Sequence, residues 1–288
     1  MYRSSPQNAK YRGGMPLSPV LELNDGHRMP QLGFGTYSIH DPEIFDAAID
    51  VGYRLLDTAK RYENEESVGQ GITASSVPRE ELFVTTKVPG DDQGHDSTIA
   101  SLEGSLERLG LDYVDLYLIH WPLPRVDRYV DTWKAMIELR ERGLTRSIGV
   151  SNFQSEQLDR IIAETGVTPA VNQIELHPYF PQAQQREIDA RLGIVTQSWS
   201  PLGRGSDLLQ NPTITEIAAK HDVDAGQVVL RWHVQIGAAP IPKSATPERF
   251  TGNLAIFSFE LDNEDLQRIA ELDRDERIGG DPATHEEF

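Results

Sequence analysis

Short apolar runs alternate with longer amphipathic runs along almost the whole chain, from residue 32 to residue 272. The short runs have the length and composition of buried strands, and the longer runs have helical periodicity. Strands that alternate with helices form a parallel sheet, so this rhythm predicts the α/β class. The eight expected strands are residues 32–35, 53–57, 82–87, 114–120, 147–150, 171–175, 194–198 and 239–241.

Two architectures fit this order of elements, a closed (β/α)₈ TIM barrel and a doubly wound open sheet. The open sheet usually carries the motif G-x-G-x-x-G after its first strand. Gly33-Phe34-Gly35 and Gly203-Arg204-Gly205 both lack the third glycine, which favours the barrel. The expected helices are residues 41–51, 64–74, 97–109, 128–142, 155–164, 183–191, 212–220 with 224–235, 247–255, and an extra C-terminal helix at 263–272.

The N-terminal region differs from the rest of the chain. Residues 1–19 are rich in Ser, Pro, Asn and Gly, which predicts a flexible leader, and Met15 is an alternative start. Segments 20–23 and 28–30, which are largely apolar, flank a turn that contains Asp25-Gly26, which predicts a β-hairpin before the barrel. No later shift in composition marks a boundary, so we expect residues 20–288 to form a single barrel domain.

Composition excludes several classes of function. The 288 residues carry a formal net charge of −18, which argues against nucleic acid and anionic membranes as partners. Because the chain has no cysteine, it cannot form disulfides, thiolate metal sites or a thiol nucleophile. It has no apolar run of signal-peptide or membrane-span length. We therefore expect a cytoplasmic monomer that acts on a small molecule.

Polar side chains gather where the expected strands end. Asp57 closes the second strand, Lys87 the third and His120 the fourth, while Tyr62 follows Asp57 in the next loop. Each has a simpler interpretation: a structural ion pair for Asp57 and Lys87, a packing role for Tyr62, and a core histidine for His120. Together, however, an acid, a lysine, a tyrosine and a histidine on one rim could donate a proton to an oxygen. An ammonium next to a tyrosine would lower the tyrosine pKa.

Three long motifs resemble the signatures of the aldo-keto reductase superfamily. They are AAIDVGYRLLDTA at residues 47–59 followed by Tyr62, LGLDYVDLYLIHWP at 109–122, and IPKSATPER at 241–249 followed by Asn253. The resemblance covers residues 20–272. The segment WSPLG at 199–203 and the short tail are similar to the bacterial 2,5-diketo-D-gluconic acid reductase branch.

The resemblance implies NADPH/NADP⁺ as cofactor and a carbonyl compound as substrate: an aldehyde, a ketone or a dicarbonyl, with keto-sugars among the candidates. Tyr62 would be the general acid in reduction, Asp57 and Lys87 would tune it, and His120 would orient the carbonyl. The implied cofactor contacts are Ser151, Asn152 and Gln173 for the nicotinamide carboxamide, Trp199 for its ring, Ser200 and Leu202 for the pyrophosphate, Lys243, Ser244, Thr246 and Arg249 for the 2′-phosphate, and Asn253 in the same motif. Cations beside hydroxyls make an anion site on physical grounds too, although a solvated helix start is the alternative.

Several positions depart from the family pattern. Lys60 and Arg61 precede Tyr62, where they face either the pocket, which would favour anionic substrates, or solvent. Gly252 stands where many relatives carry a glutamate against the adenine. The tail after Asp273 is short and acidic, which predicts a pocket open on one side. The aromatic walls of the pocket would be Tyr37, Trp121 and Trp199, with core packing as the alternative for each.

Two other functions compete with this interpretation. Asp57, His120, Glu175 and His177 could in principle bind zinc in a barrel hydrolase, but no His-x-His ends the first strand, and we expect no metal. A protein that binds NADPH without turnover could keep the cofactor residues alone. The intact set of tyrosine, lysine, aspartate and histidine argues against it.

Overall fold

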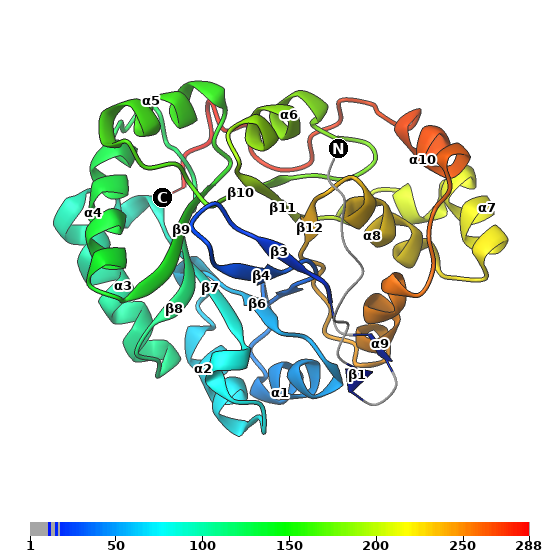
Figure 1. Ribbon diagram of the computed structural model, residues 1–288, viewed down its shortest axis with the longest axis horizontal. Helices are drawn as coiled ribbons and strands as arrows, with labels where there is room; N and C mark the ends of the chain where they lie inside the picture. The colour runs from blue at the N-terminus through cyan, green and yellow to red at the C-terminus, as the bar shows by residue number, and fades with distance from the viewer. Residues whose placement is uncertain (1–10, 13–14, 17, 288) are drawn as a thin grey trace.

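The computed structural model describes residues 11–12, 15–16 and 18–287 of the chain. Within these residues, eight parallel strands form one sheet in the order β12-β11-β10-β9-β8-β7-β6-β5, so each strand lies beside its neighbour in sequence. Figure 1 shows the helices arranged around this sheet. The strands are β5 (Phe34–Gly35), β6 (Leu55–Asp57), β7 (Phe83–Val88), β8 (Val114–Ile119), β9 (Thr145–Ser151), β10 (Val171–Glu175), β11 (Val195–Trp199) and β12 (Ala239–Pro240).

The sheet closes on itself next to β5. Gly33 N donates to Pro240 O and Gly35 N to Pro242 O, both at 3.0 Å, and Gly35 pairs in parallel with Lys243. A Cβ atom on Gly33 would lie 2.5 Å from the Leu55 side chain, so glycine allows this close approach. The predicted (β/α)₈ barrel is confirmed, and the eight strands fall where the sequence predicted them.

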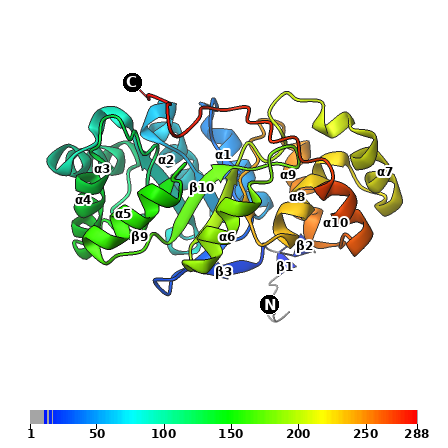
Figure 2. The same cartoon turned by 90° about the horizontal axis from the view of Figure 1, so that it is seen from above.

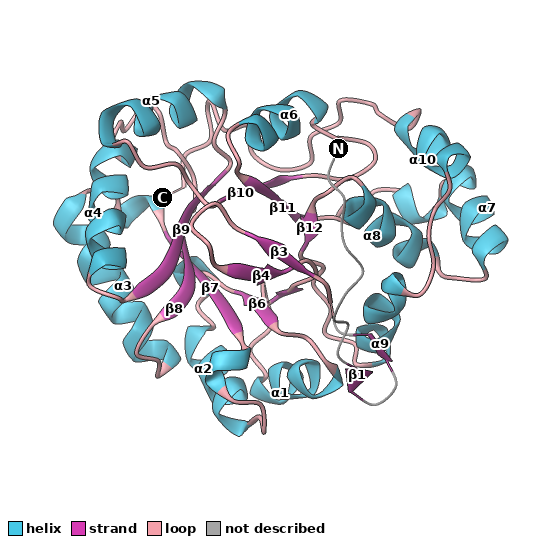
Figure 3. Cartoon of the chain, viewed as in Figure 1, coloured by secondary structure: helices cyan, strands magenta, loops and turns pink. Residues whose placement is uncertain are grey.

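The helices also follow the sequence prediction, with small shifts at their ends (Figure 3). Helix α1 begins at Pro42 after Asp41, whose side chain accepts from Glu43 N, and Gly52 caps its C-terminal end. The helices are α1 (Pro42–Val51), α2 (Glu65–Ala74), α3 (His95–Leu109), α4 (Tyr129–Glu141), α5 (Ser155–Thr165), α6 (Ala183–Arg191), α7 (Pro212–His221), α8 (Ala225–Gln235), α9 (Glu248–Leu254) and α10 (Asn263–Ala270).

The predicted hairpin precedes the barrel as β3 (Val20–Glu22) and β4 (Arg28–Pro30). Its residues Leu23 and Met29 pack against Leu55, Phe83 and other residues at the amino ends of the barrel strands. The hairpin therefore covers the amino end of the barrel. Within the predicted leader, β1 (Tyr11–Arg12) pairs with β2 (Met15–Pro16), and residues 1–10, 13–14 and 17 lie outside the described residues.

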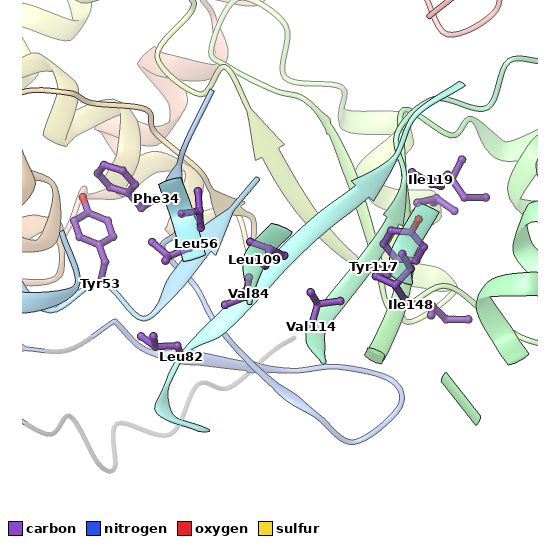
Figure 4. Close-up of a cluster of buried hydrophobic side chains, with 14 of the residues drawn as sticks. Phe34, Tyr53, Leu56, Leu82, Val84, Leu109, Val114, Tyr117, Ile119 and Ile148 are labelled. Atoms are coloured by element: carbon purple, nitrogen blue, oxygen red, sulfur yellow. The ribbon is translucent and has the colours of Figure 1, made fainter. Parts of the chain in front are cut away.

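The pleat of each strand separates two sets of side chains. One set faces the helices, as Val84, Tyr117 and Ile148 do in the large buried cluster of Figure 4. The alternate residues point into the barrel, where Leu55 and Leu116 form the layer next to the hairpin. Because Asp57, Lys87, His120, Ser151 and Gln173 share this inward parity, they come together at the carboxyl ends of the strands.

The tail after α10 runs along the end of the barrel opposite the hairpin (Figure 2). None of the helices in the described part of the chain is long and apolar enough to cross a membrane. The inward-facing polar residues and the tail therefore both lie at the carboxyl end of the barrel.

Candidate active site

The centre of the site is a buried ion pair between neighbouring strands. Lys87 Nζ on β7 lies 2.5 Å from Asp57 Oδ1 at the end of β6, and it also donates to Thr58 O at 2.9 Å. Lys87 is only 1% exposed. Burial alone would lower the pKa of Lys87, but Asp57 and Tyr62 together outweigh burial and raise it. The lysine is therefore held as a cation inside the barrel.

Tyr62 lies against this pair at the end of a short 3₁₀ helix, Lys60–Tyr62. Lys87 Nζ is 3.4 Å from Tyr62 Oη and 4.9 Å from the centre of its ring. Burial raises the pKa of Tyr62, and Lys87 opposes this rise without cancelling it. The sequence suggested a lowered pKa, because it shows a nearby cation and does not show how little water reaches the hydroxyl. The tyrosine is thus a neutral acid near pH 7.

His120 follows β8 on the same rim. Its ring centre lies 5.9 Å from that of Tyr62, nearly perpendicular to it. His120 Nδ1 lies 2.5 Å from Oε1 of Glu287 in the tail. This contact is close but is not an aligned hydrogen bond, since Nδ1 has no hydrogen-bond partner of good geometry within the described residues. Asp57, Tyr62, Lys87 and His120 thus converge as the sequence predicted, and the tail joins them.

Gln173 links the ion pair to the barrel interior. Its Nε2 donates to Asp57 Oδ2 and to Gln197 Oε1, both at 2.8 Å. Since both amide hydrogens are used inside the barrel, only the side-chain oxygen of Gln173 remains to bind a ligand. Gln173 therefore positions Asp57, and its contact with the nicotinamide stays a prediction.

The other residues predicted near the nicotinamide form one hydrogen-bonded chain. Ser151 Oγ donates to Gln173 O at 2.7 Å, and Asn152 Nδ2 contacts both His120 O and Ser151 Oγ, at 3.0 and 3.1 Å. Trp199 Nε1 donates to Asn152 Oδ1 at 2.8 Å. This bond orients the indole at the carboxyl end of the barrel, which we call the mouth. The four residues thus surround one region beside the catalytic candidates.

The residues predicted for the phosphates lie around the segment that follows β12. Lys243, Thr246 and Arg249 are exposed, whereas Ser244 is buried and its hydroxyl accepts from Thr246 N. Within the described residues, neither Lys243 nor Arg249 forms an ion pair, although the chain as a whole carries a net charge of −18. Two uncompensated cations beside two hydroxyls fit an anionic group such as a phosphate.

Three further residues belong to the predicted cofactor set. Ser200 follows β11 in a left-handed turn with φ 48°, and Leu202 packs against the buried clusters. Asn253 on α9 lies beside the hydroxyl of Tyr53, which is buried and has no hydrogen-bond partner of good geometry within the described residues. The cofactor role of Asn253 stays a prediction from the sequence.

The two predicted substrate residues differ in their surroundings. Tyr37 is 50% exposed, and its ring lies 5.1 Å from that of Tyr62. Trp121 is 8% exposed, packed 6.3 Å from Trp199 and 4.1 Å from the ring of His285. Tyr37 thus forms an open wall beside the predicted acid, while the tail covers Trp121.

The structure shows the surroundings of the positions that depart from the family pattern. Lys60 pairs with Asp92, and Arg61 lies 3.4 Å from Asp91, so the two cations are engaged outside the pocket. Gly252 has open space around the position of a Cβ atom. The predicted open side is not observed above His120, because the tail crosses the mouth there.

The contacts of the C-terminal tail with the site were not predicted from the sequence. Glu175, considered only as a metal ligand, accepts from Ile278 N at 2.6 Å and from Gly279 N at 2.8 Å. Burial alone would raise the pKa of Glu175, but these bonds and one from His177 outweigh it and lower the pKa. No local signal in the acidic tail indicates that it folds back over the strands.

The contacts of Glu175, His177 and Asp57 are also relevant to the alternative of a zinc-dependent hydrolase. Within the part of the chain that the structure describes, no group of three or more His, Asp and Glu side chains is arranged to hold a metal ion. Glu175 and His177 contact each other at 3.0 Å, and Asp57 is committed to Lys87. The side chains of the proposed zinc set are therefore used in separate contacts.

Comparison with known proteins agrees with this geometry. Residues 31–274 match the model of the Aldo/keto reductase family. The chain is 53% identical over 277 residues to 2,5-diketo-D-gluconic acid reductase B of Corynebacterium sp. (strain SHS752001), covering 95% of this chain and 100% of that protein. It is 49% identical to methylglyoxal reductase DkgA of Salmonella typhimurium, covering 91% and 96%.

A solved structure extends the comparison to the whole barrel. A Gox0644 mutant crystallised in complex with NADPH superposes with a TM-score of 0.89 and 47% identity, covering 93% of this chain and 99% of that one. The family match, the relatives and the barrel agree with the convergence of Asp57, Tyr62, Lys87 and His120. The chain therefore belongs to the aldo/keto reductase family, and with it to the NADP-dependent oxidoreductases.

Proposed function

We propose that this enzyme reduces the carbonyl group of a small molecule to an alcohol with NADPH, and that Tyr62 is the general acid. The observation that carries the proposal is the chain of contacts from Asp57 through Lys87 to the Tyr62 hydroxyl. A cation next to a half-buried phenol is suited to promote proton donation, because it stabilises the phenolate that donation leaves behind.

The proton path follows from the protonation states of these groups. Burial keeps the Tyr62 hydroxyl protonated at neutral pH, so the acid form needed for reduction is the one present. As Tyr62 gives its proton to the carbonyl oxygen, Lys87 stabilises the new negative charge, and Asp57 holds the Lys87 ammonium in place. His120, whose ring centre lies 5.9 Å from that of Tyr62, orients the carbonyl oxygen toward the hydroxyl.

The cofactor supplies a hydride to the carbonyl carbon when it is bound. Lys243 and Arg249, exposed and without an ion-pair partner in the described chain, would hold the 2′-phosphate together with Ser244 and Thr246. The other cofactor contacts that we propose are Ser151, Asn152 and Gln173 at the carboxamide, Trp199 at the ring, Ser200 and Leu202 at the pyrophosphate, and Asn253 on the adenosine side.

For substrates we propose aldehydes, ketones and dicarbonyls, keto-sugars included. The names of the two relatives, a diketogluconic acid reductase and a methylglyoxal reductase, support dicarbonyls. The exposed ring of Tyr37 beside Tyr62, with Trp121 across the mouth, supports a partly aromatic pocket. The competing role, NADPH binding without turnover, would not need the complete chain from Asp57 to Tyr62.

We also propose that the enzyme works as a monomer. The exposed large hydrophobic residues within the described chain are Val20 and Tyr37, which come from separate segments and form no extended apolar patch. Size-exclusion chromatography with light scattering tests this, and a stable dimer would contradict it.

The test of the main proposal is NADPH oxidation with a panel of carbonyl compounds. Tyr62→Phe should lower kcat by about 10²–10⁴-fold, the usual contribution of general acid catalysis, while NADPH binding persists. Tyr113→Phe is a matched control, because it removes a hydroxyl from a tyrosine that contacts Arg79 and Arg146 rather than the site. A Tyr62→Phe enzyme that kept more than about a tenth of kcat would contradict the role of Tyr62.

A further inference from the structure

The tail reaches the site through a series of separate contacts. The Glu175 carboxylate accepts from the backbone of Ile278 and Gly279, which fixes the start of the crossing. A Cβ atom on Gly279 would lie 2.3 Å from the Trp199 ring, so the backbone here presses directly on the indole. Further along, His285 packs on Trp121. The tail is therefore held at two points before it reaches the catalytic rim.

Glu287 lies inside the mouth at the end of this crossing. It is 7% exposed, with Oε1 2.5 Å from His120 Nδ1 and Oε2 accepting from Gly90 N at 3.1 Å. Its negative charge also reaches Tyr62, where it contributes to the raised pKa. A buried carboxylate thus sits beside the two residues that we propose act on the substrate carbonyl.

Most cations near the mouth are neutralised by other carboxylates. Lys60 is paired with Asp92, Arg61 with Asp91, and Arg125 with Glu286. Arg204 lies 5.7 Å from the ring of Tyr37, but it is exposed on the outer rim. The buried Lys87 cation is balanced by Asp57, and the field of an exposed charge such as Arg204 is screened more strongly than that of a buried one. Within the described residues no lysine or arginine pairs with Glu287, so its carboxylate is the main unbalanced charge beside Tyr62 and His120.

On the basis of the proposed carbonyl reduction, we propose that Glu287 determines the charge preference of the substrate pocket. Its carboxylate selects uncharged aldehydes, ketones and dicarbonyls and rejects carbonyl compounds that carry a carboxylate. The names of the two relatives, a sugar-acid reductase and a methylglyoxal reductase, represent an anionic and an uncharged substrate.

A substitution of Glu287 can test the proposal while the tail keeps its other contacts. Glu287→Gln keeps the length of the side chain and an oxygen that accepts from Gly90 N, and the anchors at Glu175 and Trp121 remain. Glu286→Gln is a matched control, because it removes the same charge from the preceding residue, which is 50% exposed and paired with Arg125.

The experiment compares kcat/KM for two aldehydes of similar shape, uncharged para-nitrobenzaldehyde and anionic para-carboxybenzaldehyde. One charge acting at roughly 10 Å through a partly screened medium changes a relative rate about tenfold. Glu287→Gln should therefore raise the ratio of the anionic to the neutral substrate by about that factor, whereas Glu286→Gln leaves it nearly unchanged. An unchanged ratio in Glu287→Gln, or equal rises in both variants, would overturn the proposal.

A binding measurement separates this inference from the proposed activity. Calorimetric titration of the NADPH-loaded protein with benzoate needs no turnover. Glu287→Gln should bind benzoate about tenfold more tightly than the wild type, and equal affinities would overturn the inference. Failure of the proposed function would instead appear as no NADPH oxidation with any carbonyl compound, whatever the benzoate result.

Discussion

Lys87 and Asp57 form a buried ion pair whose two members come from adjacent strands, with Nζ and Oδ1 2.5 Å apart. Both side chains are nearly inaccessible to water, so the charge of each depends on the other. Removing one partner of such a pair leaves an uncompensated charge in a medium that solvates it poorly. Stability and proton transfer are therefore coupled at this pair.

Lys87→Met should destabilise the protein by about 3–5 kcal/mol, because it leaves the Asp57 carboxylate buried without its cation. The double variant Asp57→Asn with Lys87→Met removes both charges and should recover most of that stability, with Gln173 still able to donate to the new amide. Neither protein should show more than residual turnover. Urea unfolding and NADPH oxidation measure the two effects, and an active double variant would show that the pair is structural only.

Arg249→Ala should weaken NADPH binding by about tenfold or more and leave NADH binding nearly unchanged, since only NADPH carries the 2′-phosphate. Fluorescence titration with each cofactor measures the difference. Arg268→Ala is the control, because Arg268 on α10 is paired with Glu216 away from this region. Equal losses for both cofactors would mean that Arg249 does not contact the phosphate.

Gly252→Glu should tighten NADPH binding by roughly 0.5–1.5 kcal/mol if the new side chain reaches the adenine, and should raise Tm slightly. Gly252 lies within α9, its φ is not positive, and a Cβ atom there meets nothing within 4 Å. The gain in Tm follows from helix propensity. Gly252→Ala isolates that contribution, so unchanged NADPH affinity in the glutamate variant would show that the position faces away from the adenine.

Asp189 should make stability depend on pH in an identifiable way. Burial raises its pKa from 3.8 to about 6, although Asn172, Gln185 and Thr196 donate to it. A raised carboxyl pKa means that the fold favours the protonated form, so this contribution is complete below pH 3.8 and is lost as the pH rises through 6.

Asp189→Asn removes that dependence while keeping a side chain of the same shape. The stability of the variant relative to the wild type should therefore increase between pH 4 and pH 7, by at most roughly 3 kcal/mol. Urea unfolding at several pH values measures this difference. Glu216→Gln, at an exposed ion pair, is the control, and a difference that stays flat with pH for Asp189→Asn would contradict the assignment.

The alternation of strands and helices could be predicted from the sequence because it is local. A buried strand needs a short apolar run and a covering helix needs a periodic apolar face, so both patterns lie within a few neighbouring residues. The polar residues that end the strands, such as Asp57, Lys87 and His120, could be predicted as a group for the same reason. Parallel strands bring their carboxyl ends to one rim, whatever the loops between them do.

Contacts between distant segments were decided only in the tertiary structure. Glu287 meets His120, and Glu175 holds the backbone of Gly279, over separations in sequence that no periodicity spans. Lys60 could have faced the pocket, and its pairing with Asp92 depends on how two loops meet. The pKa of Tyr62 was misjudged from the sequence because a neighbouring cation can be inferred from motif spacing, whereas exclusion of water requires every element packed around the hydroxyl.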